Sequence, residues 1–147
     1  EASARLGAIL AGSPEGTETA CAEYGQALGT AFQVIDDVLD YDGNSAEMGK
    51  NLGDDLREGK ATLPLILAMQ RGTPLQSLTV REAIETGSID KLHDIAAIVR
   101  ETGALMATRD AAAAEAQRAI DAAMRLPENN YRNAMVALAS QLLNRRT

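Results

Sequence analysis

Residues 29–41 read GTAFQVIDDVLDY, and both the fold and the chemistry of the chain are predicted mainly from this stretch. If it forms an α-helix, Gln33, Asp36 and Asp40 fall on one face at successive turns, and Asp37 lies beside them. The pattern therefore predicts a largely apolar helix that carries one stripe of polar and acidic side chains. The apolar positions around the stripe are Phe32, Val34, Ile35, Val38 and Leu39.

Helical periodicity continues along nearly the whole chain, with Gly and Pro at the breaks. Only 3% of the residues are aromatic, so the core must be built from Ala, Leu, Ile, Val and Met, which suits closely packed helices better than an all-β domain. We therefore predict an all-α fold in one domain of 147 residues, with Thr62 as an N-cap residue. The expected helices are residues 2–10, 15 or 17–41, 62–71, 75–86, 89–102, 104–126 and 128–145, and residues 42–61 are the longest irregular stretch.

Composition argues against several classes of function. A net charge of −7 and a pI near 4.7 disfavour nucleic-acid binding, which calls for a basic face. The longest nearly apolar run, residues 61–69, is far shorter than the roughly 20 residues that cross a bilayer, so no membrane-spanning helix is expected. The single cysteine, Cys21, forms no intrachain disulfide, and a cytoplasmic location is the default. Because the chain begins partway through a helix without an initiator Met, we expect a fragment.

The acidic stripe is locally unfavourable. Asp36 and Asp40 are like charges one turn apart, near the negative end of the helix dipole. Mg²⁺ would reverse this, because it binds carboxylate oxygens and bridges to phosphate, whereas the alternative is a solvated acidic face at a helix end. A calcium loop starting at Asp40 is excluded, because its sixth and twelfth positions are Ser45 and Asn51 where Gly and Glu are needed.

A cationic, glycine-rich loop follows the stripe. Residues 49–60 read GKNLGDDLREGK, and glycines let a backbone approach a ligand closely. Lys50 and Lys60 can each serve as a point charge for phosphate, and Lys60 stands just before a helix N-terminus, which favours an anion. The loop therefore indicates a phosphate site beside the acids, and the alternative is an exposed loop with solvated lysines.

Taken together, FQVIDDVLDY and the following GKNLGDDLREGKATLPLILA resemble the second aspartate-rich motif and downstream loop of the trans-isoprenyl diphosphate synthases, most closely the bacterial long-chain (octaprenyl) branch. The resemblance implies an isoprenoid synthase-type helical bundle around a central cavity, of which residues 1–147 are the C-terminal half. It implies a prenyltransferase that condenses isopentenyl diphosphate with an allylic diphosphate, farnesyl diphosphate in our expectation. The product would be a long all-trans polyprenyl diphosphate for quinone side chains, made by a homodimer.

The same resemblance assigns roles to individual residues. Asp36 resembles the direct ligand of a Mg²⁺ ion, and Asp37 and Asp40 support that ion through its waters or nearby. Gln33 lies one turn before Asp36 and faces the same cavity. The predicted catalytic residues are Asp36, Gln33, Lys50 and Lys60.

The cationic side chains are assigned to the substrates. Lys50 and Lys60 resemble the lysines that hold the allylic diphosphate, and Asp55 resembles the acid that orients them and completes the metal-site set. Arg145 and Arg146 match a basic C-terminal end that covers the isopentenyl diphosphate site in some members.

Several family features do not occur in these residues. The first aspartate-rich motif and a Lys-Thr pair expected just before Glu1 are missing, so we predict that residues 1–147 alone are inactive. The alternatives are a shorter-chain (geranyl or farnesyl) synthase and a non-catalytic helical subunit of the same fold. The second of these is disfavoured by the intact aspartates and lysines.

Overall fold

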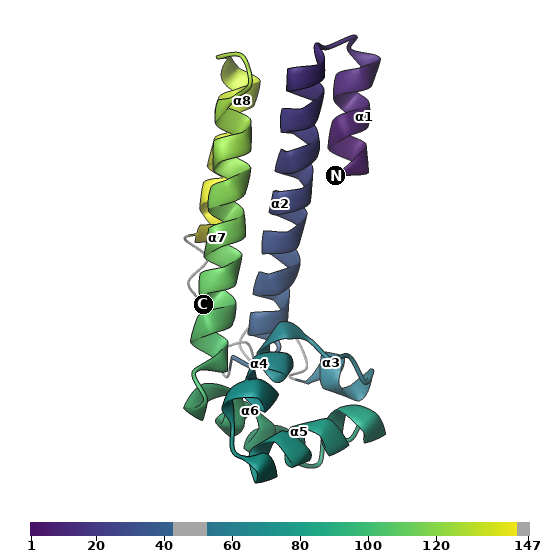
Figure 1. The fold of residues 1–147 in the computed structure, drawn as a ribbon, viewed down its shortest axis with the longest axis vertical. Helices are drawn as coiled ribbons and strands as arrows, with labels where there is room; N and C mark the ends of the chain where they lie inside the picture. The colour runs from purple at the N-terminus through teal and green to yellow at the C-terminus, as the bar shows by residue number, and fades with distance from the viewer. Residues whose placement is uncertain (43–52, 144–147) are drawn as a thin grey trace. The chain divides into compact units, whose positions relative to one another are not determined.

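The computed structural model describes residues 1–42 and 53–143, which contain helices and no strand (Figure 1). The predicted all-α fold is confirmed. By their contacts, the described residues form two compact units: residues 1–33 with those from 111 onward, and residues 34–110. The helices are α1 (Ala2–Leu10), α2 (Glu15–Leu39), α3 (Asp54–Arg57), α4 (Leu63–Arg71), α5 (Pro74–Thr86), α6 (Leu92–Glu101), α7 (Ala104–Met124) and α8 (Asn130–Leu143).

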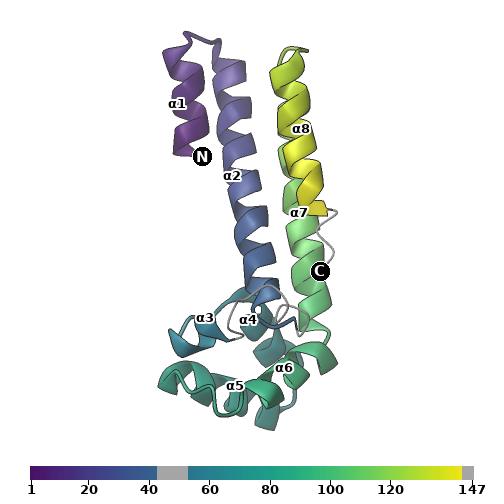
Figure 2. The ribbon, with the colours of Figure 1, turned by 180° about the vertical axis from the view of Figure 1, so that it is seen from behind.

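The first unit is held together by small side chains. Both ribbon views place α1 beside α2 (Figures 1 and 2), and Gly25 of α2 leaves no room for a Cβ, which would lie 2.8 Å from the Cβ of Ala4. The Tyr24 hydroxyl donates a hydrogen bond of 3.0 Å to the carbonyl oxygen of Met135 in α8. Because alanines let helices approach closely, this core forms with little aromatic volume. Its buried residues are Tyr24, Ala27, Ala119, Ala122, Ala123 and Ala139.

The second unit has a larger aliphatic core. It gathers the end of α2, the short helix α3, helices α4 to α6 and the start of α7 around side chains that are almost fully buried. This core includes Tyr41, directly after the acidic stripe, and Leu56, between the two lysines of the loop. Its buried residues are Tyr41, Leu56, Leu65, Ala68, Val80, Ala83, Ile95, Ile98, Val99 and Ala104.

Helix boundaries differ from the prediction at several ends. Helix α2 stops at Leu39, two residues early, because the Tyr41 N–H donates to the Val38 carbonyl at 3.1 Å and tightens the last turn. Residues 54–57, predicted to be irregular, form the helical turn α3. Helix α6 begins at Leu92 and α7 ends at Met124, both inside their predicted ranges.

Two threonines occupy N-cap positions, but only one of them caps its helix with a side-chain hydrogen bond. Thr73 and Gln76 form a capping box at α5, with hydrogen bonds of 3.2 and 2.9 Å between side chain and backbone in each direction. Thr62 stands at the N-cap of α4, as predicted, but its side chain makes no capping hydrogen bond. No helix in the described part of the chain combines the length and apolarity that crossing a membrane requires.

Candidate functional site

The acidic stripe covers the last turns of α2 and ends at Asp40, the residue directly after that helix, and its members differ in burial. Gln33 is exposed, Asp36 and Asp40 are half-buried, and Asp37 is only 8% exposed. The next residues, Val38 and Tyr41, are each 1% exposed, so this side of the helix end faces the core. The accessible part of the stripe is therefore Gln33, Asp36 and Asp40.

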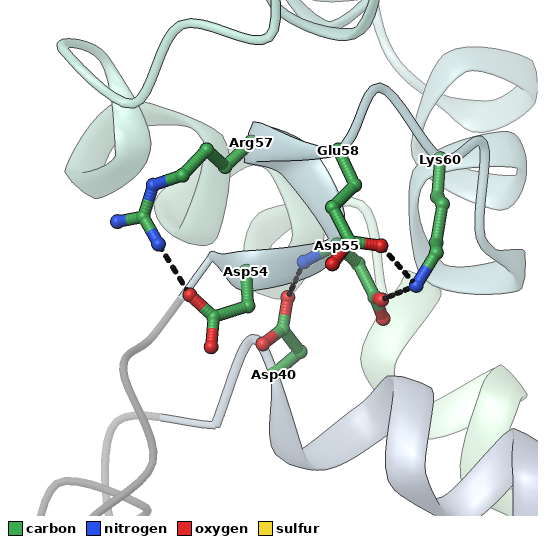
Figure 3. Close-up of polar contacts among 6 residues, drawn as sticks. All are labelled: Asp40, Asp54, Asp55, Arg57, Glu58 and Lys60. Atoms are coloured by element: carbon green, nitrogen blue, oxygen red, sulfur yellow. Dashed lines mark hydrogen bonds and ion pairs between the residues drawn. The ribbon is translucent and has the colours of Figure 1, made fainter.

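Asp40 connects α2 to the loop that carries Lys60. Its Oδ2 accepts a hydrogen bond of 3.1 Å from the backbone N–H of Asp55, in the first turn of α3 (Figure 3). The backbone N–H of Gly53 also donates to the Asp40 carbonyl oxygen at 3.4 Å. Since the first N–H groups of a helix have no partner within it, Asp40 acts as an external cap for α3.

The backbone around α3 explains how Lys60 is presented. Gly53 begins the turn and Gly59 ends it, with φ angles of 80° and 69° that favour glycine. Leu56 between them is fully buried and anchors the turn in the core. The backbone N–H of Lys60 donates to the Asp55 carbonyl oxygen at 2.9 Å, so the backbone from which the Lys60 side chain extends is fixed as well.

The ammonium group of Lys60 lies between two carboxylates. Its Nζ is 3.1 Å from Asp55 Oδ1 and 2.6 Å from Glu58 Oε2 (Figure 3). The Asp55 side chain is 19% exposed and the Glu58 side chain 61% exposed, so one partner belongs to the folded surface and the other extends into solvent. Asp54 forms a separate ion pair with Arg57 on the same turn.

Electrostatics differ between the buried and exposed groups. Burial raises the pKa of Asp40; hydrogen bonds from the Asp55 and Asp54 backbone oppose this, and the charges of those two residues add to it. Hydrogen bonds to Glu58 and Asp55 raise the pKa of Lys60, and Lys60 lowers the pKa of Glu58. Burial also raises the pKa of the Tyr41 hydroxyl, with the charges of nearby aspartates acting in the same direction.

Two arginines that no sequence motif singled out hold the end of α2. Arg109 of α7 forms an ion pair with Asp42, and Arg100 of α6 donates to the Tyr41 carbonyl oxygen at 3.4 Å. These residues lie 67 and 59 positions from their partners, so no local pattern could have revealed them. Glu58 was also missed, although its position two residues before Lys60 is a visible sequence feature.

The structure therefore brings together only some of the predicted site residues. Asp40, Asp55 and Lys60 are linked directly, whereas Gln33 is exposed and Asp36 half-buried on α2. Lys50, Arg145 and Arg146 lie outside the described residues.

The carboxylates suit a hard divalent cation that arrives with its own oxygen ligands. Among the described residues, no three His, Cys, Asp or Glu side chains come together as a ready-made metal site. Mg²⁺ seldom uses such a cage, and it is commonly bound by one or two carboxylates together with phosphate oxygens and water. The donor set of Asp36 and Asp40 on adjacent turns fits that mode.

Comparison with known proteins identifies the family. A sequence model described as polyprenyl synthetase matches residues 1–102. This chain belongs to the polyprenyl synthetase family. Within that family it is 46% identical over 140 residues to the octaprenyl diphosphate synthase of Haemophilus influenzae, an alignment that covers 95% of this chain and 43% of the relative. The chain thus spans less than half the length of that polyprenyl synthetase.

Solved polyprenyl synthetase structures share the fold. The decaprenyl diphosphate synthase of Rhodobacter capsulatus matches with a TM-score of 0.86 at 39% identity, over 96% of this chain and 44% of that one. A polyprenyl synthase of Caulobacter crescentus, solved in complex with calcium and isoprenyl diphosphate, matches with a TM-score of 0.83 at 40% identity, over 97% of this chain and 44% of that one. The described helices therefore have the isoprenoid synthase fold that the family resemblance implied.

Proposed function

We propose that residues 1–147 are the C-terminal half of a long-chain polyprenyl diphosphate synthase, which condenses isopentenyl diphosphate with an allylic diphosphate. The observation that carries this proposal is the position of Asp55. Its N–H binds the Asp40 carboxylate and its own carboxylate binds Lys60, so one residue links the acidic stripe to a cation suited to phosphate. A diphosphate held there would meet carboxylates for its metal and an ammonium for its oxygens.

Lys60 is assigned to the diphosphate of the allylic substrate. Its exposed ammonium group has three N–H donors, and each can stabilise negative charge that develops on a departing diphosphate. Asp55 orients the ammonium, and the fixed backbone of α3 keeps that orientation before the substrate arrives. Lys50 is assigned to the same diphosphate, and Arg145 and Arg146 to isopentenyl diphosphate, on the family resemblance alone.

Asp36 is assigned to a Mg²⁺ ion, with Asp40 and Asp37 supporting it. When bound, the metal supplies Lewis-acid assistance to the departure of diphosphate and a template for its oxygens. The complex of the Caulobacter relative with a divalent cation and isoprenyl diphosphate supports this assignment. Gln33, one turn before Asp36 and exposed, is assigned to the same cavity.

The remaining parts of the proposal rest on the relatives. The octaprenyl and decaprenyl diphosphate synthases among them support a long all-trans product, which would serve as a quinone side chain. Farnesyl diphosphate as the allylic substrate, a homodimer and a cytoplasmic location complete the proposal. The complete enzyme is defined as these residues together with the part of the polypeptide that carries the first aspartate-rich motif.

The test is prenyl transfer by the complete enzyme and its lysine variants. Labelled isopentenyl diphosphate, farnesyl diphosphate and Mg²⁺ should give long labelled products, resolved by length on a reversed-phase column. Lys60→Ala and Lys50→Ala should each raise the KM for farnesyl diphosphate roughly tenfold or more, because each removes a hydrogen bond to a charged group. Lys91→Ala, an exposed lysine before α6, is the matched control and should leave this KM unchanged.

Other results would point to the alternatives. Products that stop after one or two additions would identify a shorter-chain synthase. An absence of transfer by a folded complete enzyme would identify a non-catalytic subunit. If both lysine variants kept the wild-type KM for farnesyl diphosphate, the assignment of Lys50 and Lys60 to the allylic diphosphate would be wrong.

A further inference from the structure

The side chain of Glu58 occupies the place where an anion would bind Lys60. Glu58 Oε2 lies 2.6 Å from Lys60 Nζ, closer than Asp55 Oδ1 at 3.1 Å. Figure 3 shows both carboxylates converging on the same ammonium group from one short segment. A diphosphate oxygen that binds Lys60 needs the same short contact with the same positive charge.

The two carboxylates are held very differently. Asp55 is 19% exposed, its N–H is bound by Asp40, and its carbonyl oxygen accepts the Lys60 N–H at 2.9 Å. Glu58 follows the last residue of α3, and its side chain is 61% exposed. Exposed ion pairs contribute little net free energy, so the contact with Glu58 can be exchanged and the contact with Asp55 is retained.

The backbone makes the Glu58 contact specific. Gly59 has a φ of 69°, and this left-handed turn lets residues 58 and 60 present their side chains to one another. A Cβ at position 59 would lie 3.2 Å from the Ile84 carbonyl oxygen, so the turn is also seated against α5. The backbone of this turn therefore places the Glu58 carboxylate beside Lys60.

The contact between Glu58 and Lys60 changes the net charge that a substrate meets at this site. One ammonium faces two carboxylates, so this group carries a net negative charge, which repels an approaching diphosphate. Lys60 lowers the pKa of Glu58, which keeps that carboxylate ionised at neutral pH. Neutralising or displacing Glu58 would remove one of these two negative charges, so that Lys60 and Asp55 together are neutral and the repulsion is relieved.

We propose, building on the proposed function, that Glu58 is a positioning residue that binds Lys60 in the absence of substrate and is displaced by the allylic diphosphate. It competes with the substrate for one cation and so sets the affinity for it. Asp55 stays in contact with Lys60 in both states.

The experiment is Glu58→Gln in the complete enzyme, with two readouts. We expect the Kd for inorganic diphosphate in the presence of Mg²⁺, measured by calorimetry, to fall about two- to fivefold, the factor that corresponds to loss of an exposed ion pair. The KM for farnesyl diphosphate should fall by the same factor, with kcat and the KM for isopentenyl diphosphate within about twofold of wild type. Glu58→Asp retains the charge and should remain close to wild type.

Asp54→Asn is the matched control. It removes the same charge from the same short segment, but Asp54 pairs with Arg57 and not with Lys60, so the Kd for diphosphate should stay at the wild-type value. Equal effects of Glu58→Gln and Asp54→Asn would show that only the loss of a negative charge near the site matters, and not the contact with Lys60. That result would overturn the inference. A higher Kd in Glu58→Gln would also overturn it, because Glu58 would then assist binding. The calorimetric readout needs no turnover, so it separates this inference from failure of the proposed function.

Discussion

Asp36 illustrates how an unfavourable residue points to a site. It is half-buried on a largely apolar helix, beside the 8% exposed Asp37 and one turn before Asp40, near the negative end of the helix dipole. We expect Asp36→Ala in the complete enzyme to lower kcat/KM at least about a hundredfold, because loss of the proposed metal ligand would weaken stabilisation of the departing diphosphate. Thermal stability should stay the same or rise. Steady-state kinetics, a Mg²⁺ titration and calorimetric melting measure the three quantities.

The control is an acid without a proposed role. Asp110→Ala, on an exposed position of α7, removes the same side chain and should leave the kinetics and the Mg²⁺ dependence unchanged. A parallel loss of activity and melting temperature in Asp36→Ala, with unchanged Mg²⁺ dependence, would argue for a structural role of Asp36.

Asp40 should make stability depend on pH in a defined direction. Burial raises its pKa above the ordinary 3.8, so ionisation is less favourable in the folded chain than in the unfolded one. The contribution of Asp40 to the free energy of unfolding is therefore largest when the pH is below the ordinary pKa. This contribution is lost as the pH rises through the raised pKa of the folded chain. Asn keeps an oxygen for the Asp55 N–H and never ionises. Asp40→Asn should therefore be more stable than wild type at about pH 7 and equal to it near pH 3, by denaturant unfolding of the complete enzyme.

The same substitution separates stability from function at this residue. Asp40 is assigned to support of the metal, so Asp40→Asn should lower prenyl transfer at neutral pH while it raises stability. An Asn variant less stable than wild type at neutral pH would show that the hydrogen bond to Asp55 outweighs the burial of the charge.

At the scale of helices and turns, a substitution at Gly87 tests how closely the end of α5 packs against α3. Gly87 follows α5 with a φ of 62°, and a Cβ there would lie 2.8 Å from the Arg57 carbonyl oxygen at the end of α3. Gly12, after α1, has a φ of 64° and no atom within 4 Å of the same position. Gly12→Ala should therefore cost about 1–2 kcal/mol, for the left-handed backbone alone. Gly87→Ala should cost about 1–3 kcal/mol more, because a backbone carbonyl must also move.

The functional consequence distinguishes the two glycines further. Displacement of Arg57 shifts the segment that carries Glu58 and Lys60, so Gly87→Ala should also raise the KM for farnesyl diphosphate. Gly12→Ala should leave that KM unchanged. Equal stability losses in the two variants, by denaturant unfolding, would show that α5 and α3 are not in the close contact described.

The helices themselves were predictable, because hydrophobic periodicity and Gly or Pro breaks are local features of the sequence. The turn α3 was not, since its four residues are too few for periodicity and depend on burial of Leu56 and on Asp40, 15 positions from Asp55. The same limit applies to capping. Thr62 and Thr73 precede similar Pro-containing helix starts, but only Thr73 has a Gln three residues later that completes a capping box.

For the molecule as a whole, the sequence predicted roles for the acids and Lys60 but not how these residues are connected. Spacing on a helix predicts Gln33, Asp36 and Asp40 on one face; in the structure Gln33 and Asp36 belong to α2, and Asp40 directly follows its last residue. The burial of Asp37 and the pairing of Arg109 with Asp42 depend on residues from other helices, which no local spacing encodes. Predicted roles for the acids and lysines thus remain predictions, while the surroundings of the acids and of Lys60 are now known.

The described residues also present exposed apolar surface. Within the first unit, α2 and α8 line an apolar groove that includes Gly25, Gly29, Phe32 and Leu138, and the last two side chains are 52% and 51% exposed. Large exposed apolar patches mark interaction surfaces or aggregation-prone regions. We therefore expect these 147 residues, expressed alone, to self-associate or to bind the part of the fold that the longer relatives possess.

Residues 1–147 alone should transfer no prenyl group. On the proposed assignment they hold only the second aspartate-rich motif, so further metal ions and isopentenyl diphosphate would lack their ligands, and loss of positioning can account for roughly 7–11 kcal/mol of a barrier. The test incubates this chain with labelled isopentenyl diphosphate, farnesyl diphosphate and Mg²⁺, and then adds the separately expressed N-terminal half. Activity that arises only on mixing supports the proposal, and mixing with an Asp36→Ala chain should fail to restore it. Robust transfer by the chain alone would show that a site built from Asp36, Asp40 and Lys60 is sufficient, and the proposed division of the active site would be wrong.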